Sequence, residues 1–211
     1  LDAILQARPL VPFDNDTLRF ITALGRSLLS DREVRQFPEL VALGFWTRTA
    51  NITRLKERFS TSCEDILRLP RGLAFHLAPS NVDTIFVYSL LLSMLAGNVN
   101  LVRISSRAGE QSGLLLGILD GALKDAPQSI RDRIGIIRYE HDRAITDALS
   151  RRADVRIVWG GDATTSLIRQ SALAPHGTEL VFPNRYSLSA IDAVGWISHG
   201  DKATLARNFV N

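Results

Sequence analysis

The sequence has very little cysteine and no metal-binding pattern of histidines. Its single cysteine, Cys63, excludes an internal disulfide framework and any metal site built from several thiolates. Neither HxxxH nor HExxH spacing occurs among the four histidines, His76, His141, His176 and His199, so we expect no metal ion. A lone thiol is typical of proteins from a reducing compartment, and we therefore expect a cytoplasmic protein.

Long apolar runs and targeting signals are also missing. The longest apolar stretch, 85–96, falls short of the roughly 18 residues of a membrane-spanning helix, so we expect a buried helix there and no membrane span. The N-terminus lacks the basic, apolar and small-residue pattern of a secretory leader. Because the chain begins with Leu1 rather than Met, we expect it to be part of a longer protein.

Charge of one sign does not accumulate. The 25 basic and 22 acidic residues give a net charge of +3, and the basic residues are scattered, which argues against a nucleic-acid partner. The largest local excess, Arg151, Arg152 and Arg156 around Asp154, is expected to solvate the end of a helix. With 45% hydrophobic residues, the composition is that of a folded globular domain.

Hydrophobic periodicity changes near residue 70. Before it, apolar residues recur at helical spacing and predict a helix over 16–29, capped by Asn15 or Asp16, and a second over 38–59. After it, short β-branched runs alternate with amphipathic segments, the pattern of a parallel sheet with crossover helices. The expected strands are 72–78, 100–104, 135–139, 155–159, 179–182 and 187–191, and the expected helices are 82–96, 109–124, 141–151, 161–172 and 201–210.

The segment 71–106 carries the first functional signal. Its pattern predicts a strand that ends at the loop 78–81, an apolar helix, and a second strand that ends near 105. Ligands of open α/β sheets bind beyond the carboxyl ends of the strands, so both loops are expected to face one crevice. The absence of GxGxxG disfavours an ordinary Rossmann dehydrogenase, and a βαβ unit without a ligand remains an alternative.

Several segments in order along the chain resemble one enzyme family: PFDNDTLRFITALGRSLL, FPELVALGFWTRTANITRLKERF, APSNV, GNVNLVRISSR, VWGGDATTSLIR and NRYSLSAI. Over 12–192 the chain resembles the LuxC-type fatty acyl-CoA reductases of the aldehyde dehydrogenase superfamily. The resemblance implies an α/β fold, with the Rossmann-like parallel sheet of the aldehyde dehydrogenase cofactor-binding domain and a helical N-terminal layer. It implies a helical region over 1–70 and an NAD(P)-binding domain over 71–211.

In that superfamily the loop after the first strand contacts the cofactor through its backbone, and its asparagine helps to form an oxyanion hole. The matching loop here is Ala78, Pro79, Ser80 and Asn81, so the resemblance implies cofactor contacts from all four and oxyanion stabilisation by Asn81. An amide N–H can stabilise the oxygen that gains charge when a thiolate attacks an acyl carbonyl. Asn81 can also cap the following helix, which is compatible with that role.

Arg103 stands where the superfamily has a lysine near the adenosine ribose, and Ser105 and Arg107 follow it. A guanidinium at this position can bind a ribose 2′-phosphate, so the resemblance implies NADPH as the cofactor, with NADH as the alternative. For either arginine alone, a solvated strand end is an equal alternative.

The turn that begins at Trp159 matches the superfamily's glycine-containing turn beside the cofactor. Two glycines allow the backbone to approach a pyrophosphate or nicotinamide closely, and the following helix offers free N–H groups. We expect cofactor contacts from Trp159, Gly160, Gly161 and Thr164. Asp162 is assigned to capping of the helix because a carboxylate repels a pyrophosphate, and a purely structural glycine turn is the alternative.

Two departures from the superfamily pattern are informative. Aldehyde-oxidising members carry a Glu-Leu-Gly-Gly motif with a general-base glutamate, where this chain has Val-Phe-Pro-Asn at 181–184, and we do not transfer the role to Glu179. Loss of that base fits a reductase, which passes its acyl group to hydride rather than to water. The family's catalytic cysteine is expected shortly after Asn211, whereas Cys63 has no catalytic counterpart, so these residues are expected to be inactive alone.

The sequence thus predicts the cofactor-binding part of an NADPH-dependent acyl-CoA reductase. The enzyme would convert an acyl-CoA or acyl-protein thioester into an aldehyde through a cysteine thioester. An aldehyde-oxidising dehydrogenase and a non-catalytic nucleotide-binding or assembly module are the alternatives. A second copy of the chain or an acyl-transfer subunit is a possible protein partner.

Overall fold

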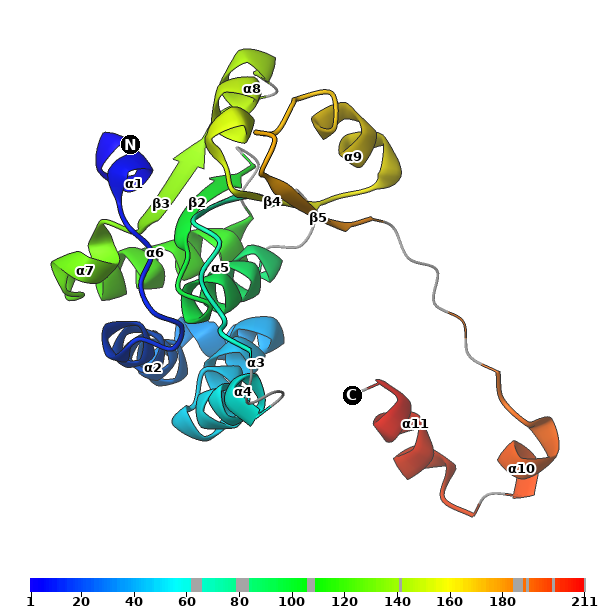
Figure 1. Cartoon of the computed structure of the whole chain (residues 1–211). Helices are drawn as coiled ribbons and strands as arrows, with labels where there is room; N and C mark the ends of the chain where they lie inside the picture. The colour runs from blue at the N-terminus through cyan, green and yellow to red at the C-terminus, as the bar shows by residue number, and fades with distance from the viewer. Residues whose placement is uncertain are drawn as a thin grey trace.

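The centre of the molecule is one parallel sheet. The computed structural model describes residues 1–61, 66–78, 84–105, 109–140, 142–183, 188, 190–198 and 200–210. Five strands lie in the order β3-β2-β1-β4-β5, all parallel (Figure 1). Their bounds are β1 Leu73–Leu77, β2 Val99–Ile104, β3 Ile134–Arg138, β4 Val155–Trp159 and β5 Thr178–Phe182. The predicted α/β class is confirmed, and five of the six expected strands are present.

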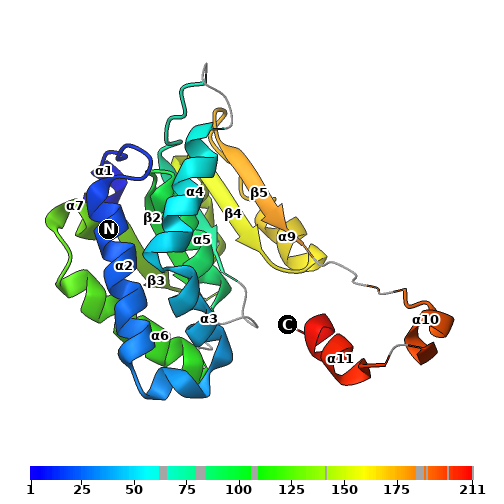
Figure 2. The same ribbon diagram turned by 90° about the horizontal axis from the view of Figure 1, so that it is seen from below.

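The sixth expected strand, 187–191, is wrong in its described part. Leu188, Ala190 and Ile191 lie in no strand, and residues 187 and 189 are outside the described residues. Alternation of apolar and polar residues indicates an extended chain, but a strand also needs a neighbour that completes its hydrogen bonds. Beyond β5 the chain leaves the body, and α10 (Ala193–Ser198) and α11 (Lys202–Val210) lie apart from it in both views (Figures 1 and 2).

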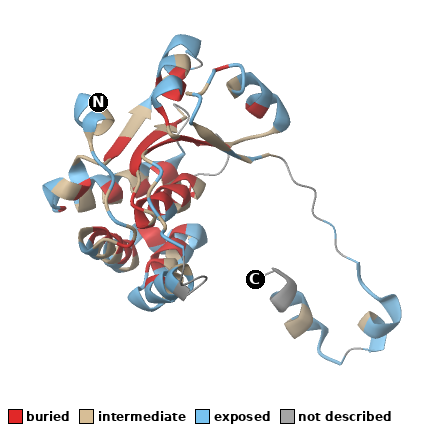
Figure 3. Ribbon diagram, viewed as in Figure 1, coloured by how far each residue is buried: buried red, intermediate tan, exposed pale blue. Residues whose placement is uncertain are grey.

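Helices cover both faces of the sheet. On one face, α5 (Ile85–Leu95) and α6 (Glu110–Lys124) pack against β1 and β2, and a second layer of helices packs on them (Figure 2). That layer consists of α2 (Asn15–Ser30), α3 (Pro38–Trp46) and α4 (Thr49–Thr61). On the other face lie α8 (Arg143–Arg152) and α9 (Asp162–Ile168). The buried residues form a large core among the helices α2 to α6 and a smaller core that includes α8, and Ala74, Val155 and Ile157 form a third, small cluster (Figure 3).

Short elements complete the body. The helix α1 (Asp2–Gln6) contacts β2, and the 3-10 helix η1 (Glu33–Gln36) and the helix α7 (Gln128–Arg131) join longer elements. None of these three was expected from the sequence, because each is too short to show hydrophobic periodicity. In the part of the chain that the structure describes, no helix is long and apolar enough to cross a membrane.

The helix expected over 38–59 is two helices, and the break is at Thr47. The Thr47 hydroxyl donates to the Gly44 carbonyl oxygen at 2.9 Å, and the Asn51 amide donates to the Phe45 carbonyl oxygen at 3.0 Å. Side chains that bind these carbonyls replace the backbone N–H groups that would continue the helix. Thr47 is fully buried beside Gly25, where an added Cβ would lie 2.0 Å from the Thr47 hydroxyl. Packing between α2 and α3 therefore decides the break.

The cap of α2 is also one residue earlier than expected. The Asp14 carboxylate accepts from the backbone N–H groups of Asp16 at 2.8 Å and Thr17 at 3.4 Å. Asn15 and Asp16, the two predicted caps, are the first residues of the helix itself. Asp14, Asn15 and Asp16 all have side chains that can cap a helix, so the sequence alone does not show which of them precedes the first helical turn.

Candidate functional site

The carboxyl ends of β1, β2, β4 and β5 lie along the same edge of the sheet. The Ala78 N–H donates to the Arg103 carbonyl oxygen at 3.0 Å, and Leu77 is paired with Val158 across β1 and β4. Ala78 therefore lies between the end of β2 and the Trp159 turn. Ala78, Arg103 and Trp159, from three of the predicted segments, thus lie along one edge of the sheet. The strand order proceeds outward from β1 to β3 on one side and from β4 to β5 on the other, and open α/β sheets usually bind ligands at such a reversal.

Trp159 forms an aromatic pair with Phe182 at the ends of β4 and β5. The two rings are stacked, with centroids 3.9 Å apart and an interplanar angle of 9°. The Trp159 indole N–H donates to the Ser89 hydroxyl oxygen of α5 at 3.3 Å, and the Gly160 N–H donates to the Phe182 carbonyl oxygen at 3.3 Å. The indole therefore points to the sheet face that α5 covers, and Phe182 remains 43% exposed.

The glycine turn leads directly into α9. Gly161 is the N-cap of this helix and Asp162 is its first residue, so the expected capping role of Asp162 is wrong. A residue can cap only when it precedes the helical backbone, and here Gly161 holds that position. A Cβ on Gly160 would lie 3.0 Å from the Thr164 methyl group, so packing within the protein also favours glycine at this position.

Arg103 points to the opposite face of the sheet from Trp159. Its guanidinium donates to the Tyr139 carbonyl oxygen at 3.0 Å and lies 5.4 Å from the centre of the Tyr139 ring. Tyr139 in turn packs in the core that includes β1 and α8. Ser105 follows the end of β2 and is half-buried. The edge thus presents an aromatic pair on one face and an anchored guanidinium on the other.

Several sequence-predicted residues are outside the described residues. They are Pro79, Ser80, Asn81 and Arg107 among the expected site residues, together with Cys63, His141, Asn184 and His199. Their roles therefore stay predictions. Among the residues that the structure does describe, no group of three or more His, Cys, Asp or Glu side chains could hold a metal ion.

Glu179 is held in an ion-pair network. Its carboxylate accepts from Arg156 at 2.6 Å and from Arg169 at 2.7 Å. Burial raises the pKa of Glu179, but hydrogen bonds and charge from the two arginines outweigh burial and bring the pKa below its ordinary value. A carboxylate held in this way is a poor general base, so Glu179 does not replace the missing general-base glutamate. The expectation that Arg156 solvates a helix end is wrong, because its side chain is 3% exposed and paired inside the protein.

Sequence reasoning missed the contacts of His76. His76 is 1% exposed, with Nδ1 at 2.9 Å from the Ser89 hydroxyl and Nε2 at 3.1 Å from the Asn100 side-chain oxygen. Burial lowers the pKa of His76 from 6.5 to about 4, although the Asn100 hydrogen bond opposes this. Polar residues inside otherwise apolar segments were the available signal, but they do not reveal which of them meet.

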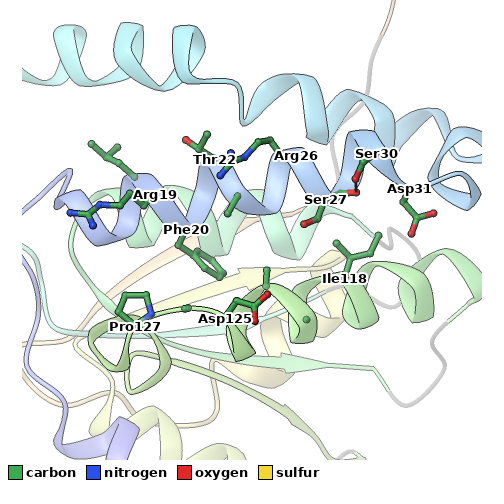
Figure 4. Close-up of a pocket in the computed structure, with 15 residues that line it drawn as sticks. Arg19, Phe20, Thr22, Arg26, Ser27, Ser30, Asp31, Ile118, Asp125 and Pro127 are labelled. Atoms are coloured by element: carbon green, nitrogen blue, oxygen red, sulfur yellow. Dashed lines mark hydrogen bonds between the residues drawn. The ribbon is translucent and has the colours of Figure 1, made fainter.

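A groove of about 870 Å³ lies elsewhere, between α2 and α6 (Figure 4). Its lining includes Phe20 and Arg26 of α2, Ile118 of α6 and Asp125. The α6 residues come from the half of the helix that is remote from the end of β2. The groove is therefore separate from the carboxyl edge of the sheet.

The strand order, the helices on both faces and the glycine turn at the carboxyl edge define a Rossmann-like α/β domain. The model of one family, described as acyl-CoA reductase (LuxC), matches residues 54–206. The chain belongs to this family, which confirms the resemblance found in the sequence.

Two curated relatives are long-chain acyl-protein thioester reductases. The protein from Aliivibrio fischeri and reductase 2 from Photobacterium leiognathi are each 31% identical to the chain over 127 residues. Each match covers 59% of this chain and 26% of the relative. The matched region thus spans about a quarter of the relatives' length.

Solved structures of the aldehyde dehydrogenase type share the fold. A putative aldehyde dehydrogenase from Burkholderia cenocepacia has a TM-score of 0.54 at 19% identity, over 78% of this chain and 38% of its own. Glyceraldehyde-3-phosphate dehydrogenase GapN from Methanocaldococcus jannaschii, complexed with NADP, has a TM-score of 0.55 at 16% identity, over 79% of this chain and 40% of its own. PnpE from Pseudomonas sp. WBC-3 has a TM-score of 0.56, and PnpE in complex with nicotinamide adenine dinucleotide has a TM-score of 0.58. Each is 14% identical to this chain, over 78% of this chain and 38% of its own.

Proposed function

We propose that this chain is the cofactor-binding part of an NADPH-dependent reductase that converts an acyl thioester into an aldehyde. The observation that carries the proposal is the acyl-CoA reductase family match over 54–206, a range that includes all five strands. The two curated relatives act on long-chain acyl-protein thioesters by name, which supports an acyl thioester as the substrate class.

The groups at the carboxyl edge fit a phosphate-bearing dinucleotide. Arg103 has five N–H donors, and its described hydrogen bond to Tyr139 uses one group of the guanidinium. Gly160 and Gly161 follow Trp159 directly and carry no side chains that would keep a ligand away from the backbone. We propose that the loop Ala78, Pro79, Ser80, Asn81, the strand end Arg103, Ser105, Arg107, and the turn Trp159, Gly160, Gly161, Thr164 hold the cofactor.

The chemistry divides between this chain and a thiol outside it. A nicotinamide cofactor supplies hydride when it is bound. The Asn81 amide would donate to the acyl oxygen and stabilise the charge that develops when a thiolate attacks the thioester. The proposal needs that thiolate from protein outside these 211 residues, because Cys63 precedes the sheet and has no catalytic counterpart in the family pattern.

The activity is tested with the full-length protein, a long-chain acyl-CoA and NADPH. We expect loss of NADPH absorbance together with an aldehyde that a hydrazine reagent traps. Oxidation of the aldehyde with NADP⁺, but no reduction of the thioester, would favour the aldehyde-oxidising alternative. Nucleotide binding without turnover of either substrate would favour the non-catalytic module, and the 211-residue chain alone is expected to behave in that way.

The cofactor preference is tested by Arg103→Ala. We expect the full-length protein to bind NADPH more tightly than NADH, and the substitution to weaken NADPH binding about tenfold while NADH binding changes little, because one charge-assisted contact to the 2′-phosphate is lost. Titration of nucleotide fluorescence measures both affinities.

Arg138→Ala is the matched control. Arg138 ends the neighbouring strand β3, is exposed, and pairs with Ile104, so it points to the opposite face from Arg103. Its removal should leave the ratio of the two affinities unchanged. Equal affinity for NADPH and NADH before and after Arg103→Ala would refute the assignment.

A further inference from the structure

A chain of hydrogen bonds runs from the buried strand β1 to the Trp159 ring at the carboxyl edge. The Ser89 hydroxyl oxygen lies 2.9 Å from His76 Nδ1 and 3.3 Å from the Trp159 indole nitrogen. Ser89 and His76 are buried, at 8% and 1% exposed, and Ser89 is on α5 whereas Trp159 ends β4. One hydroxyl therefore joins three elements of the fold.

We propose that His76 and Ser89 are positioning residues, which hold the Trp159 indole and with it the Trp159–Phe182 aromatic pair at the cofactor edge. The link to nucleotide binding rests on the function proposed above. Neither residue lies at the carboxyl edge itself: His76 acts through Ser89, and Ser89 acts through Trp159.

The direction of each of these hydrogen bonds follows from the one that Asn100 makes. The Asn100 amide nitrogen donates to the Asn98 carbonyl oxygen at 2.8 Å, which orients the Asn100 side chain so that its oxygen faces His76 Nε2. An amide oxygen only accepts, so Nε2 carries the proton and donates. In the neutral imidazole, Nδ1 is then an acceptor.

The Ser89 hydroxyl must therefore donate to His76 Nδ1. Its oxygen keeps lone pairs, and it accepts from the Trp159 indole N–H, which is a donor only. Each group has the role that its neighbour requires, and burial keeps the imidazole neutral. Thus Trp159 donates to Ser89, Ser89 donates to His76, and His76 donates to Asn100.

This series of hydrogen bonds limits where the Trp159 indole can lie. Among the contacts that the structure describes, Ser89 is the hydrogen-bond partner of the Trp159 N–H, and stacking on Phe182 restrains the other side of the ring. An aromatic stack alone allows the rings to slide, whereas a hydrogen bond at the ring edge sets the position. His76 prevents the Ser89 hydroxyl from turning its hydrogen toward the indole.

The test compares Ser89→Ala with Ser93→Ala in the full-length protein labelled with 5-fluorotryptophan. Ser93 is one turn further along α5 and equally buried, but it accepts from Asn98 and not from Trp159. The fluorine resonance of residue 159 is assigned by its loss in Trp159→Phe. We expect this resonance to shift and broaden in Ser89→Ala and in His76→Phe, and to stay unchanged in Ser93→Ala.

Nucleotide affinity is measured on the same samples. Loss of one neutral hydrogen bond should weaken NADPH binding about threefold to tenfold in Ser89→Ala, with Ser93→Ala as wild type. A residue-159 resonance in Ser89→Ala identical to wild type would overturn the proposal, and a shifted resonance with unchanged affinity would overturn its link to nucleotide binding. If the wild-type protein binds no NADPH, the proposed function fails, while the resonance comparison still decides the positioning role.

Discussion

Replacement of Arg156 by methionine is expected to lower the free energy of unfolding by about 3–5 kcal/mol, the usual loss when one partner of a buried ion pair is removed. Arg156 donates to Glu179 at 2.6 and 2.9 Å, to the Ser171 carbonyl oxygen at 2.6 Å and to the Ser150 hydroxyl at 3.1 Å. Methionine fills much of the space but leaves these acceptors without their donor. Urea unfolding followed by circular dichroism measures the loss.

Two further variants separate the ion pair from simple packing. Arg169→Met removes the second, 60% exposed partner of Glu179, and it should cost less than about 1 kcal/mol because solvent screens that pair. Arg156→Met combined with Glu179→Leu should recover part of the loss, since the carboxylate that has lost Arg156 is removed, while the Ser171 carbonyl oxygen still lacks its donor. A double variant as unstable as Arg156→Met alone would contradict this account.

The second large effect is a loss of stability in mild acid that depends on His76. Its pKa is about 4 in the folded protein against 6.5 ordinarily, so between these values the unfolded chain binds a proton that the folded protein does not. Stability is therefore complete above pH 6.5 and falls as the pH decreases toward 4. The shift corresponds to about 3 kcal/mol.

The contribution of His76 is isolated by comparison with His76→Gln. Unfolding free energies at pH 7 and pH 4 should differ by about 3 kcal/mol less in this variant, because glutamine does not titrate. Ser93→Ala is the control: it changes a buried side chain that does not titrate, and it should leave the pH dependence as in wild type. The same pH dependence in His76→Gln and wild type would show that His76 does not carry the effect.

Much of the sheet could be predicted because its signals are local. Each of the five strands is a short run rich in apolar residues, and each begins and ends within one residue of the predicted bounds. Parallel strands buried on both faces need such runs whatever their neighbours are. The break at Thr47 and the lack of strand structure at Leu188, Ala190 and Ile191 were not predictable in this way, because each depends on what the segment packs against or pairs with.

In the candidate site, too, local features could be predicted from the sequence and contacts between strands could not. The segments that end at Ala78, Arg103 and Trp159 could be chosen from the sequence, since strand ends followed by polar or glycine-containing loops can be recognised one at a time. Arg156 was misjudged because its partner Glu179 lies on the next strand, and only the register of β4 with β5 brings the two together.

The sequence by itself determined the alternation of strands and helices, the family, and the loops that end at the carboxyl edge, because these are carried by neighbouring residues. Only the tertiary structure decided that Arg156 is buried on Glu179 and that His76, Ser89 and Trp159 form one hydrogen-bonded chain. Those residues come from different strands and a helix. They meet because the order and register of the strands set the distances between them, and no local pattern encodes that order.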